Sequence, residues 1–371
     1  MRIAFFHNLP DGGAKRVLYE QVKNLLKYNY VEVYEIDNKE NFFDLYSLGV
    51  KINKYKFKID QPIFGITCRI TKDFNNFYNL KKLHKKIARD VDNKKYDIVI
   101  VHPDKFTQAP FILSFLKTRN IYYCEEFLRI VYEDQFKLNG DVPFIKNIYE
   151  EMTRKIRKNI DYSNARYANF IISNSKFTSD NIKKVYFRDS FVCYPGIDER
   201  VFKPLRLKKE YDILFIGEKN KFDGYDIFKK SIEMFAKKPI IKIISRKSGK
   251  FSLSDKELVN EYNKSKLTVA INHNEPFGFI PLESMSCSVP VIAAREGGFL
   301  ETVIDKKTGL LVERNPDDIY NALYNLLKND TLREGFSINS RKYILSTWTW
   351  EKRIKNLLDI IDKCKKKQIK N

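Results

Sequence analysis

Glu275 and Glu283 stand with seven residues between them in a segment whose residue types suit a ligand that carries several hydroxyl groups. Ionised carboxylates only accept hydrogen bonds, so the pair could bind the hydroxyls of a sugar and of a ribose. A helix is expected to start at residues 277–280, where free backbone N–H groups attract an anion such as a diphosphate. These residues therefore predict a sugar-nucleotide site, with Glu283 on the ribose and Glu275 on the sugar. The alternative is that both are ordinary solvated glutamates.

The elements that must position this pair are a strand, a loop, a short helix and a second strand. Residues 266–271 and 290–294 are short apolar runs rich in branched side chains, which is typical of buried strands. Pro281 suits the first turn of a helix, where its missing N–H group costs nothing. In an open parallel sheet the loop of such a unit lies at the carboxyl ends of the strands, where ligands bind.

The segment from residue 274 to residue 312 resembles the signature of the retaining family-four glycosyltransferases, also called glycosyl transferases group 1. The residues that carry the resemblance are Glu275, Phe277, Gly278, Glu283, Pro290, Gly297, Gly298, Glu301, Thr308 and Gly309. The resemblance implies a GT-B fold and transfer of a hexose from a UDP- or GDP-linked sugar to a saccharide, lipid or protein. It implies no metal ion and no other cofactor.

The resemblance also implies roles for single residues in this chain. Glu275 is assigned a catalytic role at the transferred sugar. The donor-binding residues around it are Phe277, Gly278, Phe279, Ile280 and Glu283.

The length of 371 residues and the hydrophobic content of 43% predict a globular protein with two domains. The apolar run at the N-terminus is too short for a signal peptide, and no stretch approaches the roughly 20 apolar residues of a membrane span. We therefore expect a cytoplasmic protein. The five cysteines are scattered and form no Cys-x-x-Cys pair, so they predict neither a disulfide framework nor a zinc site. Asp90 and Asp92 could suggest a metal motif, but their helix-to-strand loop belongs to the opposite edge of the sheet.

The net charge of +21 would attract nucleic acid, an anionic membrane or a phosphorylated ligand. Basic residues alternate with aromatic or apolar ones at residues 51–58 and 154–158, which favours peripheral contact with an anionic membrane. The alternatives are a biased composition and a solvated basic face. Nothing resembles a groove-reading helix or an aromatic RNA-binding pattern, so nucleic acid ranks last among the partners.

The first half of the chain alternates apolar strands with helical patterns, as in a doubly wound parallel sheet of the α/β class. Turn-forming residues between 192 and 204 mark a domain boundary. We predict two Rossmann-like domains facing across a cleft: an acceptor domain at 1–200 and a nucleotide-sugar domain at 207–345. By resemblance, the amphipathic helix in residues 346–371 crosses back to the first domain.

Three segments of the first domain contain candidate ligand contacts. Gly12 and Gly13 follow the first strand and allow a close approach of the backbone to a donor, although a Gly pair is more often only a turn. His102 follows the strand 97–101; a single His is commonly structural, but the resemblance assigns it a catalytic role in positioning the sugar. The resemblance also assigns Glu126 and Arg129 to the acceptor side, although Glu125 stands where the family commonly has His.

The loop after residue 217 departs from the family pattern. The family has Arg and Lys there for the donor diphosphate, whereas this chain has Glu218 and Asp223. We predict that Lys219, Lys221 and Arg246 replace them. The alternative is a catalytically inert relative that still binds sugar nucleotides.

Overall fold

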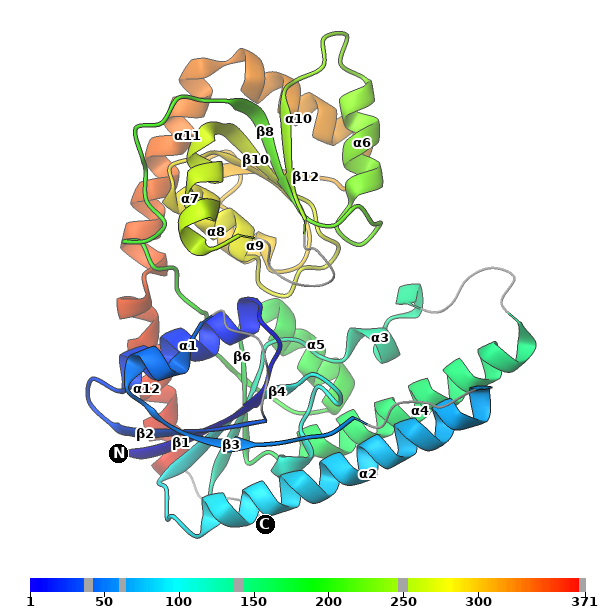
Figure 1. Ribbon diagram of the computed structural model, residues 1–371. Coiled ribbons are helices and arrows are strands. Elements are labelled where there is room, and N and C mark those ends of the chain that lie inside the picture. Colours follow the sequence, from blue (N-terminus) through cyan, green and yellow to red (C-terminus); the bar gives the residue numbers. More distant parts are fainter. Residues whose placement is uncertain (37–42, 60–64, 137–142, 246–252, 367–371) are drawn as a thin grey trace. The chain divides into compact units, whose positions relative to one another are not determined.

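The computed structural model describes residues 1–36, 43–59, 65–136, 143–245 and 253–366, which form two compact units (Figure 1). The first unit comprises Met1–Asn174, Thr178–Cys193 and Leu357–Asn371. The second comprises Ser175–Phe177 and Tyr194–Asn356. Each unit has its own parallel sheet, as the α/β prediction requires.

Among the described residues of the first unit, seven parallel strands pair in the order β3-β2-β1-β4-β5-β6-β7. The strands are β1 (Arg2–Asn8), β2 (Tyr30–Ile36), β3 (Lys51–Tyr55), β4 (Ile98–Asp104), β5 (Asn120–Cys124), β6 (Phe170–Ser173) and β7 (Phe191–Val192). The central strands β1, β4 and β5 are buried along almost their whole length, because helices cover both faces of such a sheet. The step from β3 through β2 and β1 to β4 is the doubly wound topology expected from the sequence.

The helices of this unit include one short connector and two long helices. Their bounds are α1 (Gly13–Leu25), α2 (Gly65–Asp92), α3 (Arg129–Tyr132), α4 (Phe144–Arg166) and α5 (Lys176–Tyr186), with short 3₁₀ turns at η1 (Leu45–Leu48), η2 (Phe111–Ser114) and η3 (Asp134–Phe136). The helices α2 and α4 run beside each other (Figure 1), and the Tyr149 hydroxyl donates to Asp73 at 2.6 Å between them. The side chain of Asp92, the last residue of α2, accepts from the backbone N–H groups of Lys117 and Thr118.

In the second unit the described strands pair in parallel in the order β12-β11-β10-β8-β9. They are β8 (Tyr211–Ile216), β9 (Ile241–Ile244), β10 (Ser265–Ala270), β11 (Val291–Ala294) and β12 (Gly309–Val312). The helices are α6 (Tyr225–Glu233), α7 (Asp255–Lys264), α8 (Phe279–Ser286), α9 (Phe299–Thr302), α10 (Pro316–Lys328) and α11 (Asp330–Tyr343), followed by a π-helical turn, η4 (Ile344–Trp348). The Asn315 side chain accepts from the Asp318 N–H at 2.9 Å and so caps the start of α10.

The last helix, α12 (Trp350–Lys366), begins in the second unit and ends in the first. Its end is attached to the first unit because Arg119 donates to the Cys364 carbonyl at 3.0 Å. The predicted return of the C-terminal helix is therefore confirmed.

The borders of the two units differ from the predicted residues. The first unit ends at Cys193 instead of residue 200, and it resumes at Leu357 instead of residue 346. The reason is that the segment after Cys193 packs in the second unit, where the Ile197 N–H donates to the Trp348 carbonyl at 2.8 Å. None of the described helices is long and apolar enough to cross a membrane.

Candidate functional site

The turn between β10 and α8 is built on close backbone contacts. Gly278 precedes the first residue of α8 with φ of +94°, a left-handed conformation that side chains other than glycine rarely adopt. A Cβ atom on Gly298 would lie 2.5 Å from the Phe277 carbonyl oxygen. The Gly298 N–H donates to the Glu275 carbonyl at 2.7 Å. Gly297 and Gly298 therefore allow a close approach to the backbone of residues 274–277, and the Gly298 N–H fixes the Glu275 carbonyl.

Glu301, which carried part of the family resemblance, supports this turn from the other side. Its carboxylate accepts from the backbone N–H groups of Lys176 and Phe177, both at 2.8 Å, and from the Tyr194 hydroxyl at 2.7 Å. Ser175 donates to the Pro276 carbonyl at 2.6 Å. These bonds explain why residues 175–177 belong to the second unit, and they make Glu301 a structural residue.

Glu283 lies on the buried face of α8 with only 5% of its surface exposed. The hydroxyl of Tyr262, a buried residue of α7, donates to its carboxylate at 2.7 Å. Tyr262 thus fixes one oxygen of the Glu283 carboxylate, and the contact of this carboxylate with a ribose stays a prediction. The sequence did not reveal this partner, because the two residues come from separate helices.

The loop from Gly217 to Gly224 is organised by Asp223, one of the two acids that replace expected cations. Its carboxylate accepts from the Glu218 N–H at 2.6 Å and from the Asn272 side chain at 2.7 Å. Asp223 therefore ties the loop after β8 to the end of β10. The side chains of Lys219 and Lys221 are exposed in this loop, whereas Arg246 lies outside the described residues.

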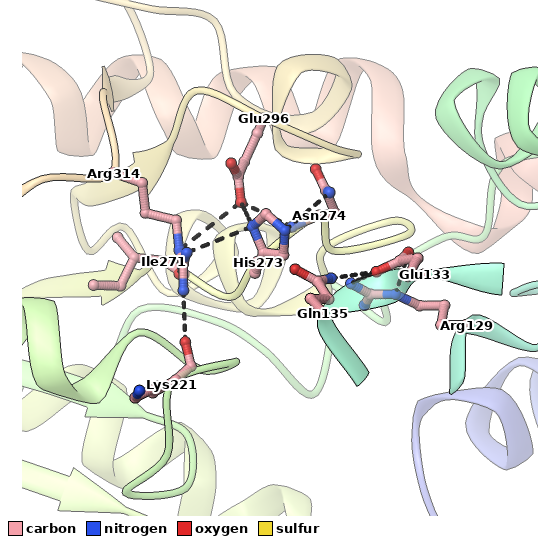
Figure 2. A network of polar contacts seen from close by, with 9 residues as sticks. All are labelled: Arg129, Glu133, Gln135, Lys221, Ile271, His273, Asn274, Glu296 and Arg314. Carbon is pink, nitrogen blue, oxygen red and sulfur yellow. Dashed lines mark hydrogen bonds and ion pairs between the residues drawn. The ribbon is translucent and has the colours of Figure 1, made fainter. Parts of the chain in front are cut away.

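A cation that sequence reasoning missed holds the same loop. Arg314 donates from Nη2 to the Lys221 carbonyl at 2.7 Å and from Nε to the Ile271 carbonyl at 2.9 Å (Figure 2). Its neighbour Glu296 accepts from the Asn274 N–H at 2.8 Å and lies 2.9 Å from His273 Nδ1. Arg314 and Glu296 together connect the ends of β10, β11 and β12 to the turn that carries Glu275. The sequence signal that could have predicted this role is the position of Arg314, a basic residue shortly after strand β12.

In the first unit, His102 lies within β4 and not after its end, because the strand continues to Asp104. The prediction that the strand ends at residue 101, with His102 directly after it, was therefore wrong. The ring is fully buried, with Nδ1 at 3.1 Å from Glu125 Oε1 and Nε2 at 3.0 Å from Gln21 Oε1. Burial lowers the pKa of His102 to about 3 and raises the pKa of Glu125 to about 8. The predicted role of His102 in positioning a sugar stays a prediction.

Glu126 and Arg129, the two acceptor-side candidates, lie together. Arg129 Nη1 is 3.5 Å from the Glu126 carboxylate, but its stronger bonds go to Glu133, at 2.8 Å from Nε and 3.1 Å from Nη2 (Figure 2). Burial raises the pKa of Glu126. Gln135 also donates to Glu133. The structure thus adds Glu133, which sequence reasoning missed, as the main partner of Arg129.

Gly12 and Gly13 occupy the start of α1, as predicted. Gly12 is the residue before the helix and its carbonyl accepts the first backbone bond, from Arg16, at 3.0 Å. Beside them Lys15 and Asp11 form an ion pair at 2.6 Å. The predicted donor contact of the two glycines remains a prediction.

The model of the family described as glycosyl transferases group 1 matches residues 248–343, which include Glu275 and Glu283. The second unit contains a glycosyl transferases group 1 domain. The family resemblance of the sequence is thereby confirmed. The turn from β10 to α8, with its paired glycines, lies inside this group 1 domain.

Two curated relatives of this chain are named as enzymes of sugar transfer. A probable sucrose-phosphate synthase of Thermosipho melanesiensis is 27% identical over 257 residues, 59% of this chain and 60% of that protein. An uncharacterized glycosyltransferase of Methanocaldococcus jannaschii is 30% identical over 206 residues, 49% of this chain and 56% of that protein. The match thus spans less than two thirds of the length of either relative.

The fold is also similar to that of a solved structure, HepE of Anabaena in complex with UDP. The TM-score is 0.74 at 14% identity, and the match covers 98% of this chain and 100% of that one. A likeness at this identity concerns the fold alone. It confirms the prediction of a GT-B fold with two Rossmann-like domains.

Proposed function

We propose that this protein is a retaining, metal-independent glycosyltransferase. It moves a hexose from a nucleoside-diphosphate sugar to a saccharide, lipid or protein acceptor. The bond between the anomeric carbon and the diphosphate breaks, an acceptor oxygen bonds to the same face of the sugar, and the leaving phosphate takes the acceptor proton. This scheme needs no protein base, and it assigns the donor to the second unit and the acceptor to the first.

The observation that supports this proposal most strongly is the turn from β10 to α8 within the group 1 domain. It combines a backbone-fixed Glu275, the start of α8 and a buried Glu283 that Tyr262 holds at 2.7 Å. Carboxylates at fixed positions suit the hydroxyls of a sugar and a ribose. The start of α8 suits the leaving diphosphate, where negative charge develops in the transition state.

Besides the start of α8, the groups that we assign to neutralise the diphosphate are the side chains of Lys219 and Lys221. Their exposed side chains belong to the loop that Asp223 and Arg314 hold in place. Arg314 already bonds two backbone carbonyls, so its part is to position the loop. Lysines on a fixed loop could act as point charges where the family has Arg and Lys.

The test combines donor binding with turnover. Calorimetric titration with UDP-glucose, UDP-N-acetylglucosamine and GDP-mannose should detect binding of at least one donor. Slow hydrolysis of that donor, carrying a radiolabelled sugar, should accompany it. Glu275→Ala should lower this turnover roughly 100-fold, the scale expected for loss of one preorganised polar group in an active site. The matched control is Glu334→Gln, a substitution of an exposed side chain on α11, which should leave turnover unchanged.

A second function, a sugar-nucleotide-binding protein without catalysis, is favoured by one observation. Asp223 places a carboxylate, held by Glu218 and Asn272, where the family has a cation. This alternative predicts donor binding without turnover. Unchanged turnover in Glu275→Ala would contradict the enzyme proposal, and binding of no donor would contradict both functions.

A further inference from the structure

The exposed edge of α4 carries a row of large apolar side chains. Phe144 is 78% exposed, Ile148 51%, Met152 37% and Ile156 39%. Residues four positions apart lie on one side of a helix, so these four form a stripe along α4, which we call the α4 stripe. Four large apolar residues in one row differ from the single exposed apolar residues that are normal on protein surfaces.

The opposite side of α4 is the side that packs in the first unit. Asp161, Asn164 and Ala165 are buried. Towards α2, Tyr149 donates to Asp73 at 2.6 Å and the Arg157 guanidinium lies 5.9 Å from the Phe77 ring centroid. These contacts fix the rotation of α4 about its axis. The α4 stripe is therefore left outside the core of its unit.

Basic side chains are also exposed on α4, and of these Lys155, three residues after Met152, lies on the side of the stripe. Lys146, Lys155 and Lys158 are exposed on α4, and Glu151 is an exposed acid among them. The neighbouring helix α2 repeats the combination on its own exposed side. There Phe74 is 70% and Tyr78 53% exposed, and Lys81, Lys82, Lys85 and Lys86 are exposed on the same helix.

The other basic segment singled out in the sequence, residues 51–58, behaves differently. Its residues 51–55 form the edge strand β3, where Lys51 lies 3.4 Å from Glu32 and Lys54 3.3 Å from Glu35. Those pairs offset the charge of two of the four lysines in this segment. Of the two candidate segments, residues 154–158 alone adjoin an exposed apolar row among the described residues.

Apolar side chains next to lysines match the chemistry of one partner, a bilayer with anionic headgroups. The apolar row can enter the boundary between headgroups and acyl chains, while the lysines remain at the level of the phosphates. Nucleic acid would use the charge but would have no use for Phe144, Ile148 and Met152. We propose that the α4 stripe and its lysines dock this protein on an anionic membrane surface. This inference goes beyond sugar transfer, and it can be tested without a donor.

The test is flotation of the full chain with lipid vesicles at two salt concentrations. Vesicles of phosphatidylcholine with 30% phosphatidylglycerol should bind the protein, whereas pure phosphatidylcholine vesicles should bind it at least tenfold less. The double variant Ile148→Asn/Met152→Asn should bind the anionic vesicles at least tenfold more weakly. Lys155→Gln and Lys158→Gln should each weaken binding roughly fivefold and reduce its dependence on salt.

The matched control is Ile338→Asn on α11, which removes a side chain that is 69% exposed in the second unit. It should bind vesicles like the wild type, and circular dichroism should show that every variant is folded. Equal binding to both vesicle types, or equal loss in the control, would overturn the proposal. A concentration-dependent dimer that Ile148→Asn/Met152→Asn abolishes would assign the stripe to a second copy instead. Salt-dependent RNA binding that requires Lys155 would assign the face to nucleic acid.

Discussion

His102 and Glu125 form a buried pair whose protonation follows from hydrogen-bond chemistry. The Oε1 atom of Gln21 can only accept, so the Nε2 atom of His102, at 3.0 Å, carries the hydrogen in this network. The Nδ1 atom of a neutral imidazole then needs a donor, and Glu125 at 3.1 Å can donate only when it is protonated. The raised pKa of Glu125 and the lowered pKa of His102 agree with this neutral pair. A neutral carboxyl here replaces the His of the resembling family.

This pairing predicts how stability depends on pH. The Glu125 pKa rises from an ordinary 4.5 to about 8 on folding, so the folded state keeps a proton that the unfolded state releases. Its contribution is fully present below pH 4.5 and falls as pH rises towards about 8, by up to about 1.4 kcal/mol per pH unit. Glu125→Gln removes this dependence. The difference in unfolding free energy between wild type and variant, from urea titrations at pH 5 to 8.5, should fall steadily.

His102 is present in both the wild type and the Glu125→Gln variant. Its effect on the unfolding free energy changes with pH in the opposite direction, because its folded pKa lies below the unfolded value. Its effect on stability, a loss as pH falls below about 6.5, should largely cancel in the comparison. Glu334→Gln should follow the wild type at every pH. A difference that stays constant across this range would mean that Glu125 is ionised in the folded protein.

At the scale of elements, the turn from β10 to α8 depends on how closely another turn can approach it. Gly298 bonds the Glu275 carbonyl at 2.7 Å, and its missing Cβ leaves room for the Phe277 backbone. The strands and α8 were evident from apolar runs and Pro281. The close approach of the two turns was not, because it joins segments that are neighbours only in the folded sheet.

Gly298→Ala should therefore move the turn that carries Glu275. Its Cβ would lie 2.5 Å from a backbone oxygen that cannot rotate away. We expect a loss of about 1–3 kcal/mol in unfolding free energy, the usual cost of overpacking, and donor binding at least tenfold weaker in calorimetric titrations. Gly335→Ala is the matched control, because nothing lies within 4 Å of its Cβ position in α11. It should instead stabilise the protein by about 0.5–1 kcal/mol. Unchanged donor affinity in Gly298→Ala would show that the turn adjusts.

At the scale of the whole molecule, the sequence predicted what short patterns encode. The two parallel sheets and the amphipathic C-terminal helix rest on patterns within about 20 residues, whereas the return of that helix to the first unit was expected from the family resemblance. What it missed are partners from distant segments, such as Tyr262 for Glu283 and Arg314 for the loop at Lys221. Those contacts depend on which strands lie beside each other, and a single sequence does not display that order.

The end of α12 shows how far apart in sequence the parts of one unit can be. Leu357, Ile361 and Cys364 are buried, and they belong to the first unit although more than 160 residues of the second unit precede them. Arg119 bonds the carbonyls of Cys364 and Lys365, and Lys365 lies 3.2 Å from Asp97. The first unit therefore reaches its full stability only when the C-terminal residues are in place.

Leu357→Ala and Ile361→Ala should each destabilise the first unit by about 2–5 kcal/mol, since each leaves a cavity in a packed site. Hydrogen exchange can report on each unit by itself, which matters because a protein with two units need not unfold in one step. Exchange should become faster in β4 and β5, while β8 and β10 of the second unit stay as protected as in the wild type. Ile338→Ala, at a position 69% exposed, is the control and should leave both units unchanged. Faster exchange confined to β8 and β10 would contradict the assignment of the last helical turns to the first unit.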